Sequence, residues 1–162
     1  MLATSVQKIY DVFFEKLEKD STFFTYQDVS EEEAIEIANE RAFAYLKDAV
    51  ATIVLNCVPD IDFTNYNEIE FAEDLSPIEI GLLADGMYDA YFSREAARYK
   101  TLSFLFVPTD LQVFSPANER NSWTTLYETI HSKFLDSIAR YASRDRITGK
   151  LKMIDYDQYA DI

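Results

Sequence analysis

The amino-acid sequence predicts an all-α protein: a bundle of about four helices with a long acidic loop and an extended C-terminal arm. Apolar residues make up 48% of the 162 residues, which is enough for one hydrophobic core in a single domain. Glycine and proline number only 3 and 4, too few for the many turns of an all-β fold. Apolar residues instead recur at spacings of three and four, as on one face of a helix.

The first two helices are predicted before residue 57. The first runs from about residue 5 to residue 19 and carries one apolar stripe, formed by Val6, Ile9, Tyr10, Phe13 and Leu17. The second begins with a capping box, in which Ser30 accepts a hydrogen bond from the amide of Glu33 and the Glu33 side chain reaches back. Its second half, up to about residue 56, is apolar nearly all round, so we expect it to be the central helix.

The third and fourth helices both open with a serine–proline pair, an N-cap followed by a residue suited to the first helical position. The third is predicted from Ser76-Pro77 to about residue 100, and the fourth from Ser115-Pro116 to about residue 141. Residues 101–114, between them, are predicted to form a short extended segment or a hairpin.

Two glycines interrupt the predicted third helix. Gly81 and Gly86 each cost about 1 kcal/mol relative to alanine inside a helix. We therefore expect a close helix crossing that compensates for this cost.

Acidic side chains dominate the first part of the chain. Residues 1–90 contain 20 acidic and 5 basic side chains, a net charge of −15, whereas residues 91–162 contain 9 and 10, a net charge of +1. The first part should repel nucleic acid, whose backbone is bound mainly by lysine and arginine. Solubility alone is the alternative explanation for this charge.

The connection between the second and third helices is long, acidic and without a basic residue over residues 60–74. Loops of this length are uncommon in a compact domain and are often functional. Ile69 and Phe71 alternate with glutamate, so a short strand is possible here. We assign an acidic surface to this loop and to the start of the second helix: Glu31, Glu32, Asp60, Asp62, Glu68, Glu70 and Glu73.

The last twenty residues lose the helical spacing. We therefore divide the chain into a helical bundle, residues 1–142, and an extended arm, residues 143–162, which is basic up to Lys152 and acidic from Asp155. Aromatic side chains in the loop and the segregated charges of the arm suit contacts with a partner. The predicted partner interface comprises Phe63, Tyr66, Ile69, Phe71, Arg144, Arg146, Lys150, Leu151, Lys152, Met153, Tyr156 and Tyr159.

Side chains that commonly carry catalysis are scarce. His131 is the only histidine, and its place on a helix indicates a solvated or core-edge side chain rather than a general base. With Cys57 as the only cysteine, the sequence argues against a zinc site. The segment from Asp60 begins like a calcium loop, but the positions that need glycine and glutamate hold Asn65 and Phe71. We therefore expect a non-enzymatic protein without a cofactor.

No apolar run approaches the ~20 residues of a membrane span. The first residues also lack the basic and apolar regions of a signal peptide. We expect no membrane partner, and a protein that stays in the cell that makes it or in a particle assembled there.

Two segments of the chain resemble a known group of proteins. Residues 71–87, FAEDLSPIEIGLLADGM, are similar to the DL-x-x-x-EI-x-x-LA-x-x-M segment of small structural proteins of tailed bacteriophages. Residues 110–118, DLQVFSPAN, are similar to the D-F-x-x-F-S-x-A-N segment of the same proteins. The resemblance covers roughly the last ninety residues and includes the final helix, a tyrosine and an acidic tail.

This resemblance implies a virion structural protein of the head-to-tail connector, or adaptor, kind. Such adaptors are small helical bundles with a long loop and an extended C-terminal tail, and their copies form a ring, commonly dodecameric, beneath the portal protein. The tail or the loops insert into the portal, and the ring supports the next neck or tail protein. For this chain the implied partners are other copies, the portal and a neighbouring neck protein, with DNA passing nearby without specific binding.

Three other functions are compatible with the sequence. A tail terminator or baseplate component would use much the same parts. An acidic phage inhibitor, or DNA mimic, would use the negative charge to bind a host protein. A carboxylate-metal enzyme is the third, and titration with Mg²⁺, Mn²⁺ and Ca²⁺ would test it.

Overall fold

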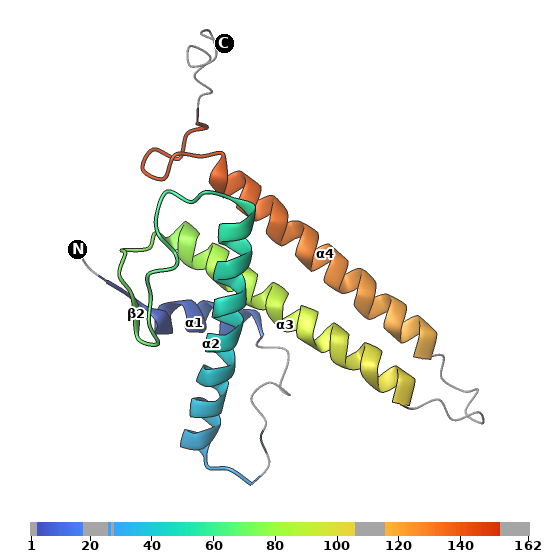
Figure 1. The fold of residues 1–162 in the computed structure, drawn as a ribbon. Helices are drawn as coiled ribbons and strands as arrows, with labels where there is room; N and C mark the ends of the chain where they lie inside the picture. The colour runs from blue at the N-terminus through green and yellow to red at the C-terminus, as the bar shows by residue number, and fades with distance from the viewer. Residues whose placement is uncertain (1–2, 18–25, 27, 106–115, 153–162) are drawn as a thin grey trace.

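Four helices form the body of the described part of the protein, which confirms the predicted all-α bundle (Figure 1). The computed structural model describes residues 3–17, 26, 28–105 and 116–152. The helices are α1 (Val6–Lys16), α2 (Glu31–Asn56), α3 (Pro77–Leu105) and α4 (Pro116–Ala142). Two short strands, β1 (Thr4–Ser5) and β2 (Glu70–Phe71), pair antiparallel, and Thr4 lies opposite Phe71.

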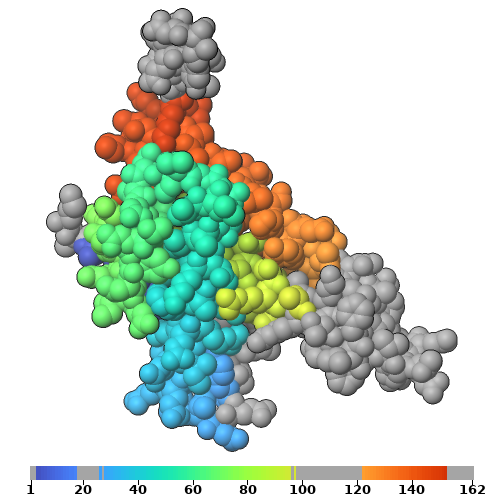
Figure 2. Space-filling view, in the orientation of Figure 1, coloured from blue at the N-terminus to red at the C-terminus, as the bar shows by residue number. Residues whose placement is uncertain are grey.

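The central helix is α3, because it contacts α1, α2 and α4. The expectation that the second helix is central was wrong, and the reason lies in the two halves of that helix. Its buried side chains begin only at Ala38, and its first turns project from the body (Figure 2). In contrast, α3 and α4 run side by side in opposite directions, and α2 crosses them (Figure 1).

The two glycines of α3 have different surroundings. A Cβ at Gly86 would lie 2.7 Å from the Cβ of Ala49 in α2 and 2.7 Å from a ring carbon of Phe134 in α4. The close helix crossing predicted at Gly86 is therefore confirmed. A Cβ at Gly81 would meet no atom within 4 Å, so the prediction was wrong for that position.

The predicted helix starts are present with their caps. The Ser30 and Glu33 side chains form both hydrogen bonds of the capping box at α2. At α3, the amide of Ser76 donates to Glu79 over 2.6 Å and the amide of Glu79 donates to Ser76. The third helix continues to Leu105, so residues 101–105 are helical rather than extended. The rest of the predicted extended segment, residues 106–114, lies outside the described residues.

The acidic loop between α2 and α3 is anchored in the core by two aromatic side chains. Phe63 and Phe71 are fully buried, and Tyr66 stacks on Phe71 with ring centroids 4.8 Å apart. The short strand expected near residues 69–71 is present as β2. Its partner, β1, was not predicted, because two residues carry no periodicity. Both phenylalanines therefore stabilise their own domain, which corrects their assignment to a partner interface.

The first part of the predicted arm is a tight turn rather than an extended segment. Over residues 143–152, the amide of Lys152 donates to the carbonyl of Ser143, and the amide of Asp145 donates to that of Lys150. The carboxylate of Asp145 accepts from the amide and hydroxyl of Thr148, both over 2.7 Å. Gly149 closes the turn with a φ of 66°, which favours glycine. Residues 153–162 lie outside the described part of the chain, so the extended arm stays a prediction there.

Candidate interaction surfaces

A buried carboxylate fixes the 143–152 turn to the bundle. Glu79, on the first turn of α3, is fully buried. Its oxygens accept hydrogen bonds from Arg146 Nε over 2.7 Å, from Arg146 Nη2 over 3.1 Å and from the Tyr141 hydroxyl over 2.9 Å. Arg146 also donates to the backbone carbonyl of Asp74. One arginine therefore joins the turn, the acidic loop and α3.

The charge of Glu79 is stabilised despite its burial. Burial alone would raise the pKa of this carboxyl, but the hydrogen bonds from Arg146, Ser76 and Tyr141 outweigh it, and the pKa lies below its usual value. The pKa of the Tyr141 hydroxyl is raised by burial and by its hydrogen bond to Glu79. The 143–152 turn thus leaves the bundle in a fixed direction.

A long groove runs along the surface where α3 and α4 meet. One end is a hollow of about 630 Å³ and the other a hollow of about 380 Å³. Both hollows are lined by Asp85, Ser137 and Arg140, so they are continuous. We call this surface the α3–α4 groove.

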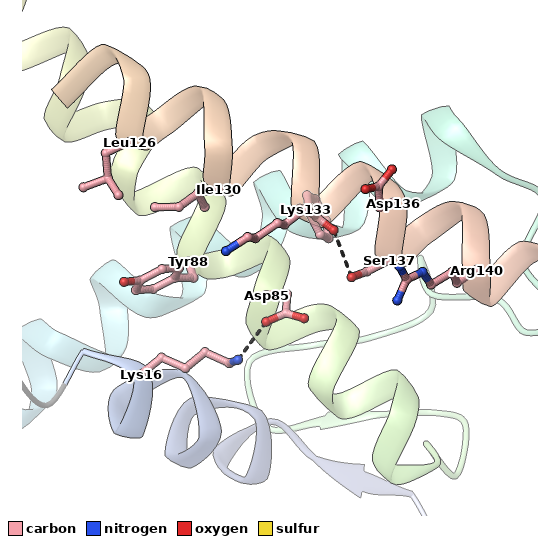
Figure 3. Close-up of a pocket in the computed structure, with 10 residues that line it drawn as sticks. Lys16, Asp85, Tyr88, Leu126, Ile130, Lys133, Asp136, Ser137 and Arg140 are labelled. Carbon is pink, nitrogen blue, oxygen red and sulfur yellow. Dashed lines mark hydrogen bonds and ion pairs between the residues drawn. The ribbon is translucent and has the colours of Figure 1, made fainter. Parts of the chain in front are cut away.

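The larger hollow also borders α1 (Figure 3). Lys16 on α1 forms a 2.7 Å ion pair with Asp85 on α3, below the Lys133 and Arg140 side chains of α4. The hydroxyl of Ser137 donates to the carbonyl of Lys133 over 3.0 Å, one turn earlier in the same helix. Ser137 and Asp85 are thus both engaged in bonds that stabilise the bundle.

The smaller hollow combines an apolar floor with a cationic rim. We call this end the arginine groove and define it by Pro77, Ile78, Gly81, Leu82, Arg140 and Arg144. The side chain of Ile78 is 70% exposed, whereas Leu82 beneath it is buried. Arg140 and Arg144 are exposed, and neither forms an ion pair with any residue that the structure describes. Arg144 Nη1 donates instead to the carbonyl of Gly149.

The exposed half of α2 carries a second surface, of opposite charge. Glu32, Ile35, Glu36 and Glu40 form what we call the acidic α2 face, and Ile35 is 58% exposed. This face lines a hollow of about 770 Å³ together with Tyr10, Phe43, Glu68 and Ile69, among other residues, and none of the lining residues is basic. Burial and the charge of Glu68 raise the pKa of Tyr10.

The residues predicted to form an acidic surface are mostly where the sequence places them. The exposed members are Glu31, Glu32, Asp60, Asp62, Glu68 and Glu70, and Glu73 is half-buried. Two of them are engaged in local contacts. Asp60 forms a 2.8 Å ion pair with Lys152, and Asp62 accepts hydrogen bonds from the amide and hydroxyl of Thr64. Those hydrogen bonds lower the pKa of the Asp62 carboxyl.

The residues predicted to form a partner interface are divided by the structure. Ile69, Arg144, Lys150, Leu151 and Lys152 are exposed, and Tyr66 is half-buried. Besides Phe63 and Phe71, Arg146 is also committed to its own domain, through Glu79. Met153, Tyr156 and Tyr159 lie outside the described residues.

The sequence did not indicate that Ile35, Ile78, Gly81 and Arg140 lie at the surface. Ile35 and Ile78 follow helix caps and read as core positions, because apolar residues near a helix start usually face the bundle. The one available signal was the presence of two cations, Arg140 and Arg144, near the end of the last helix.

His131 lies at the edge of the core, facing α3. Its Nδ1 is 3.1 Å from both carboxylate oxygens of Asp89, which is buried. Burial raises the pKa of Asp89, and the hydrogen bond from His131 partly opposes that shift. Arg94 on α3 forms a 2.6 Å ion pair with Asp48 on α2.

Within the described ranges, no group of three or more histidine, cysteine, aspartate or glutamate side chains is arranged to hold a metal ion. No helix among those residues has the length and apolar character needed to cross a membrane. Comparison of the chain with protein-family models, curated proteins and solved structures found no match.

Proposed function

We propose that the protein is a non-enzymatic structural component of a tailed phage virion, a head-to-tail connector that forms a ring between the portal and the neck proteins of the tail. The resemblance of residues 71–87 and 110–118 supports this class of protein. The virion is then its location, and other copies of the chain, the portal and a neighbouring neck or tail protein are its partners.

One structural observation carries the proposal. The arginine groove and the acidic α2 face have opposite charges, and both expose an apolar side chain. The backbone segments that carry them, the end of α4 and the start of α2, lie at opposite ends of the body (Figure 1). A ring built from identical subunits uses one contact repeatedly, with two different surfaces on each copy. Exposed apolar groups flanked by charges are typical of protein contacts, where charge fixes register.

The acidic surface adds support for a position near DNA. The exposed carboxylates of α2 and of the 60–74 loop would repel the phosphate backbone. Within a ring, such repulsion lets DNA pass without being held.

Electron microscopy of the purified protein tests this proposal. We expect ring-shaped oligomers in negative stain, either from the protein alone or after mixing with portal. A protein that stays monomeric and binds neither portal nor neck proteins would contradict the proposal.

The acidic α2 face also favours a second candidate, a DNA mimic that binds a host enzyme. Glu32, Glu36 and Glu40 recur every four residues, about 6 Å along α2, and so form a row of negative charges, as phosphates do along a DNA strand. Affinity purification from bacterial lysate distinguishes the two candidates. Salt-sensitive recovery of a nucleic-acid enzyme would favour the mimic.

A further inference from the structure

We propose that the arginine groove of one copy binds the acidic α2 face of a second copy, in a repeating head-to-tail contact. This inference rests on the proposed function as a ring-forming protein and specifies which surfaces meet. Four features of the molecule support it, and they concern the floor of the groove, its charge, the number of charged groups on each surface and the placement of the two surfaces.

The floor of the groove contains a glycine that the fold does not require. Gly81 costs about 1 kcal/mol relative to alanine, and no neighbouring atom would obstruct a Cβ there. Gly86 differs, because α2 and α4 occupy the space that its side chain would need. The open space above Gly81, beside the exposed Ile78, leaves room for an apolar side chain from outside the chain.

The rim of the groove selects an acidic occupant. Arg140 and Arg144 have no carboxylate partner in the described part of the chain, although the protein has a net charge of −14. The acidic groups that line the groove are already engaged, since Asp85 pairs with Lys16 and Asp145 accepts hydrogen bonds within its turn. Guanidinium groups form strong paired hydrogen bonds with carboxylates, so a glutamate-bearing surface suits this rim.

Each surface carries two exposed charges, and the two signs are opposite. Arg140 lies near the end of α4 and Arg144 in the 143–152 turn that follows it, whereas Glu32 and Glu36 are four residues apart on α2. The two glutamates therefore lie about 6 Å apart along the axis of α2. They can pair with the two arginines, while Ile35, between the glutamates, enters the space above Gly81.

The two surfaces cannot meet within one molecule. The start of α2 and the end of α4 lie at opposite ends of the body (Figure 1). Contact therefore requires a second copy, and each copy keeps one free surface for the next. The contact propagates until the rotation between copies closes a ring.

Two complementary variants test this contact. Arg140→Glu/Arg144→Glu reverses the charge of the groove rim, and Glu32→Lys/Glu36→Lys reverses the charge of the acidic α2 face. Each alone should weaken self-association about a hundredfold or more, because both charge pairs become repulsive. Sedimentation velocity, at a concentration where the unmodified protein forms oligomers, measures the effect. Asp11→Lys/Glu15→Lys on α1 is the matched control, since it makes the same charge change with the same spacing on exposed residues and should leave the oligomers intact.

Mixing the two defective variants gives the sharpest result. The intact groove of one variant meets the intact helix face of the other, and the two charge-reversed surfaces are again opposite in sign, so mixing should restore association between the two variants. Gly81→Leu supplies an independent test without any charge change. It fills the floor from a position with open space, so the monomer should stay folded by circular dichroism while association falls.

Each outcome separates the contact from the wider proposal. Oligomers that persist in both charge variants and in Gly81→Leu would overturn the contact but leave the ring-forming function standing. A mixture that stays monomeric while the unmodified protein assembles would do the same. An unmodified protein that is monomeric alone and with portal would overturn both.

Discussion

The acidic loop between α2 and α3 and the 143–152 turn are both irregular segments packed against the bundle, but different interactions hold them. Phe63 and Phe71 anchor the loop by burying aromatic rings. The turn depends on the ion pair between Arg146 and the buried Glu79. Apolar burial responds little to pH or salt, whereas a buried ion pair requires a charged carboxylate. The two irregular segments should therefore unfold under different conditions.

The largest expected effect comes from the anchor of the loop. Phe71→Ala should lower the free energy of unfolding by about 3–5 kcal/mol, because it leaves a cavity in the core and removes the ring on which Tyr66 stacks. Chemical denaturation measures this loss. Ile69→Ala is the matched control, two residues away and exposed, and should change stability by less than about 0.5 kcal/mol. Equal losses in the two variants would refute the anchoring role.

The anchor of the turn ranks second. Arg146→Ala should cost about 2–3 kcal/mol, because Glu79 stays buried without its cation but keeps its hydrogen bonds from Ser76 and Tyr141. Arg144→Ala, in the same turn, should change the free energy of unfolding by less than about 0.5 kcal/mol, since its side chain is exposed. The same denaturation series compares them, and a harmless Arg146→Ala would mean that the turn is not held by this pair.

Acid should separate the two anchors. The pKa of Glu79 is lower in the folded protein than in the unfolded chain, so its contribution is fully present above the unfolded value, ~4.3, and is lost as pH falls through the folded pKa. The stability difference between the unmodified protein and Glu79→Gln should therefore shrink below about pH 4. The loss caused by Phe71→Ala should stay constant over the same range. A constant Glu79→Gln difference would argue against charge as the source of the stabilisation.

The smallest effect is expected at the surface pair that joins the two segments. Lys152 and Asp60 are both partly exposed, so Lys152→Ala should cost about 0.2–1 kcal/mol. Salt near 1 M, where the Debye length is about 3 Å, should abolish the difference. Thermal unfolding at low and high salt provides the measurement, and a loss that survives high salt would indicate packing by the lysine stem instead.

Local signals predicted the helices well. Ser30 with Glu33, and Ser76 with Glu79, specify their helix starts within a few residues of sequence, and the structure has both caps. The central position of α3 depends instead on which helix faces meet. That pairing cannot be read from the sequence of any one helix. Gly86 was the exception, because its cost inside a helix signalled the crossing with α2 and α4.

The candidate surfaces were harder to predict for a physical reason. Phe63 and Phe71 lie in an acidic segment, which predicts a surface loop. Only the tertiary fold shows that their rings enter the core. The pairing of Arg146 with Glu79 spans 67 residues, so neither sequence neighbourhood reveals it. The charges of the 143–152 turn and of α2 could be read from the sequence. The apolar floor of the groove at Gly81 could not, because it forms only when the helices pack together.

The long separation of Glu79 and Arg146 also has a consequence during synthesis on the ribosome. At roughly 5–20 residues per second, Arg146 is made about 3–13 s after Glu79. The acidic α2 face is made before Arg140 and Arg144, the rim of the arginine groove. During that interval a nascent chain displays the helix face without the groove, so two chains at this stage of synthesis cannot join through the proposed contact.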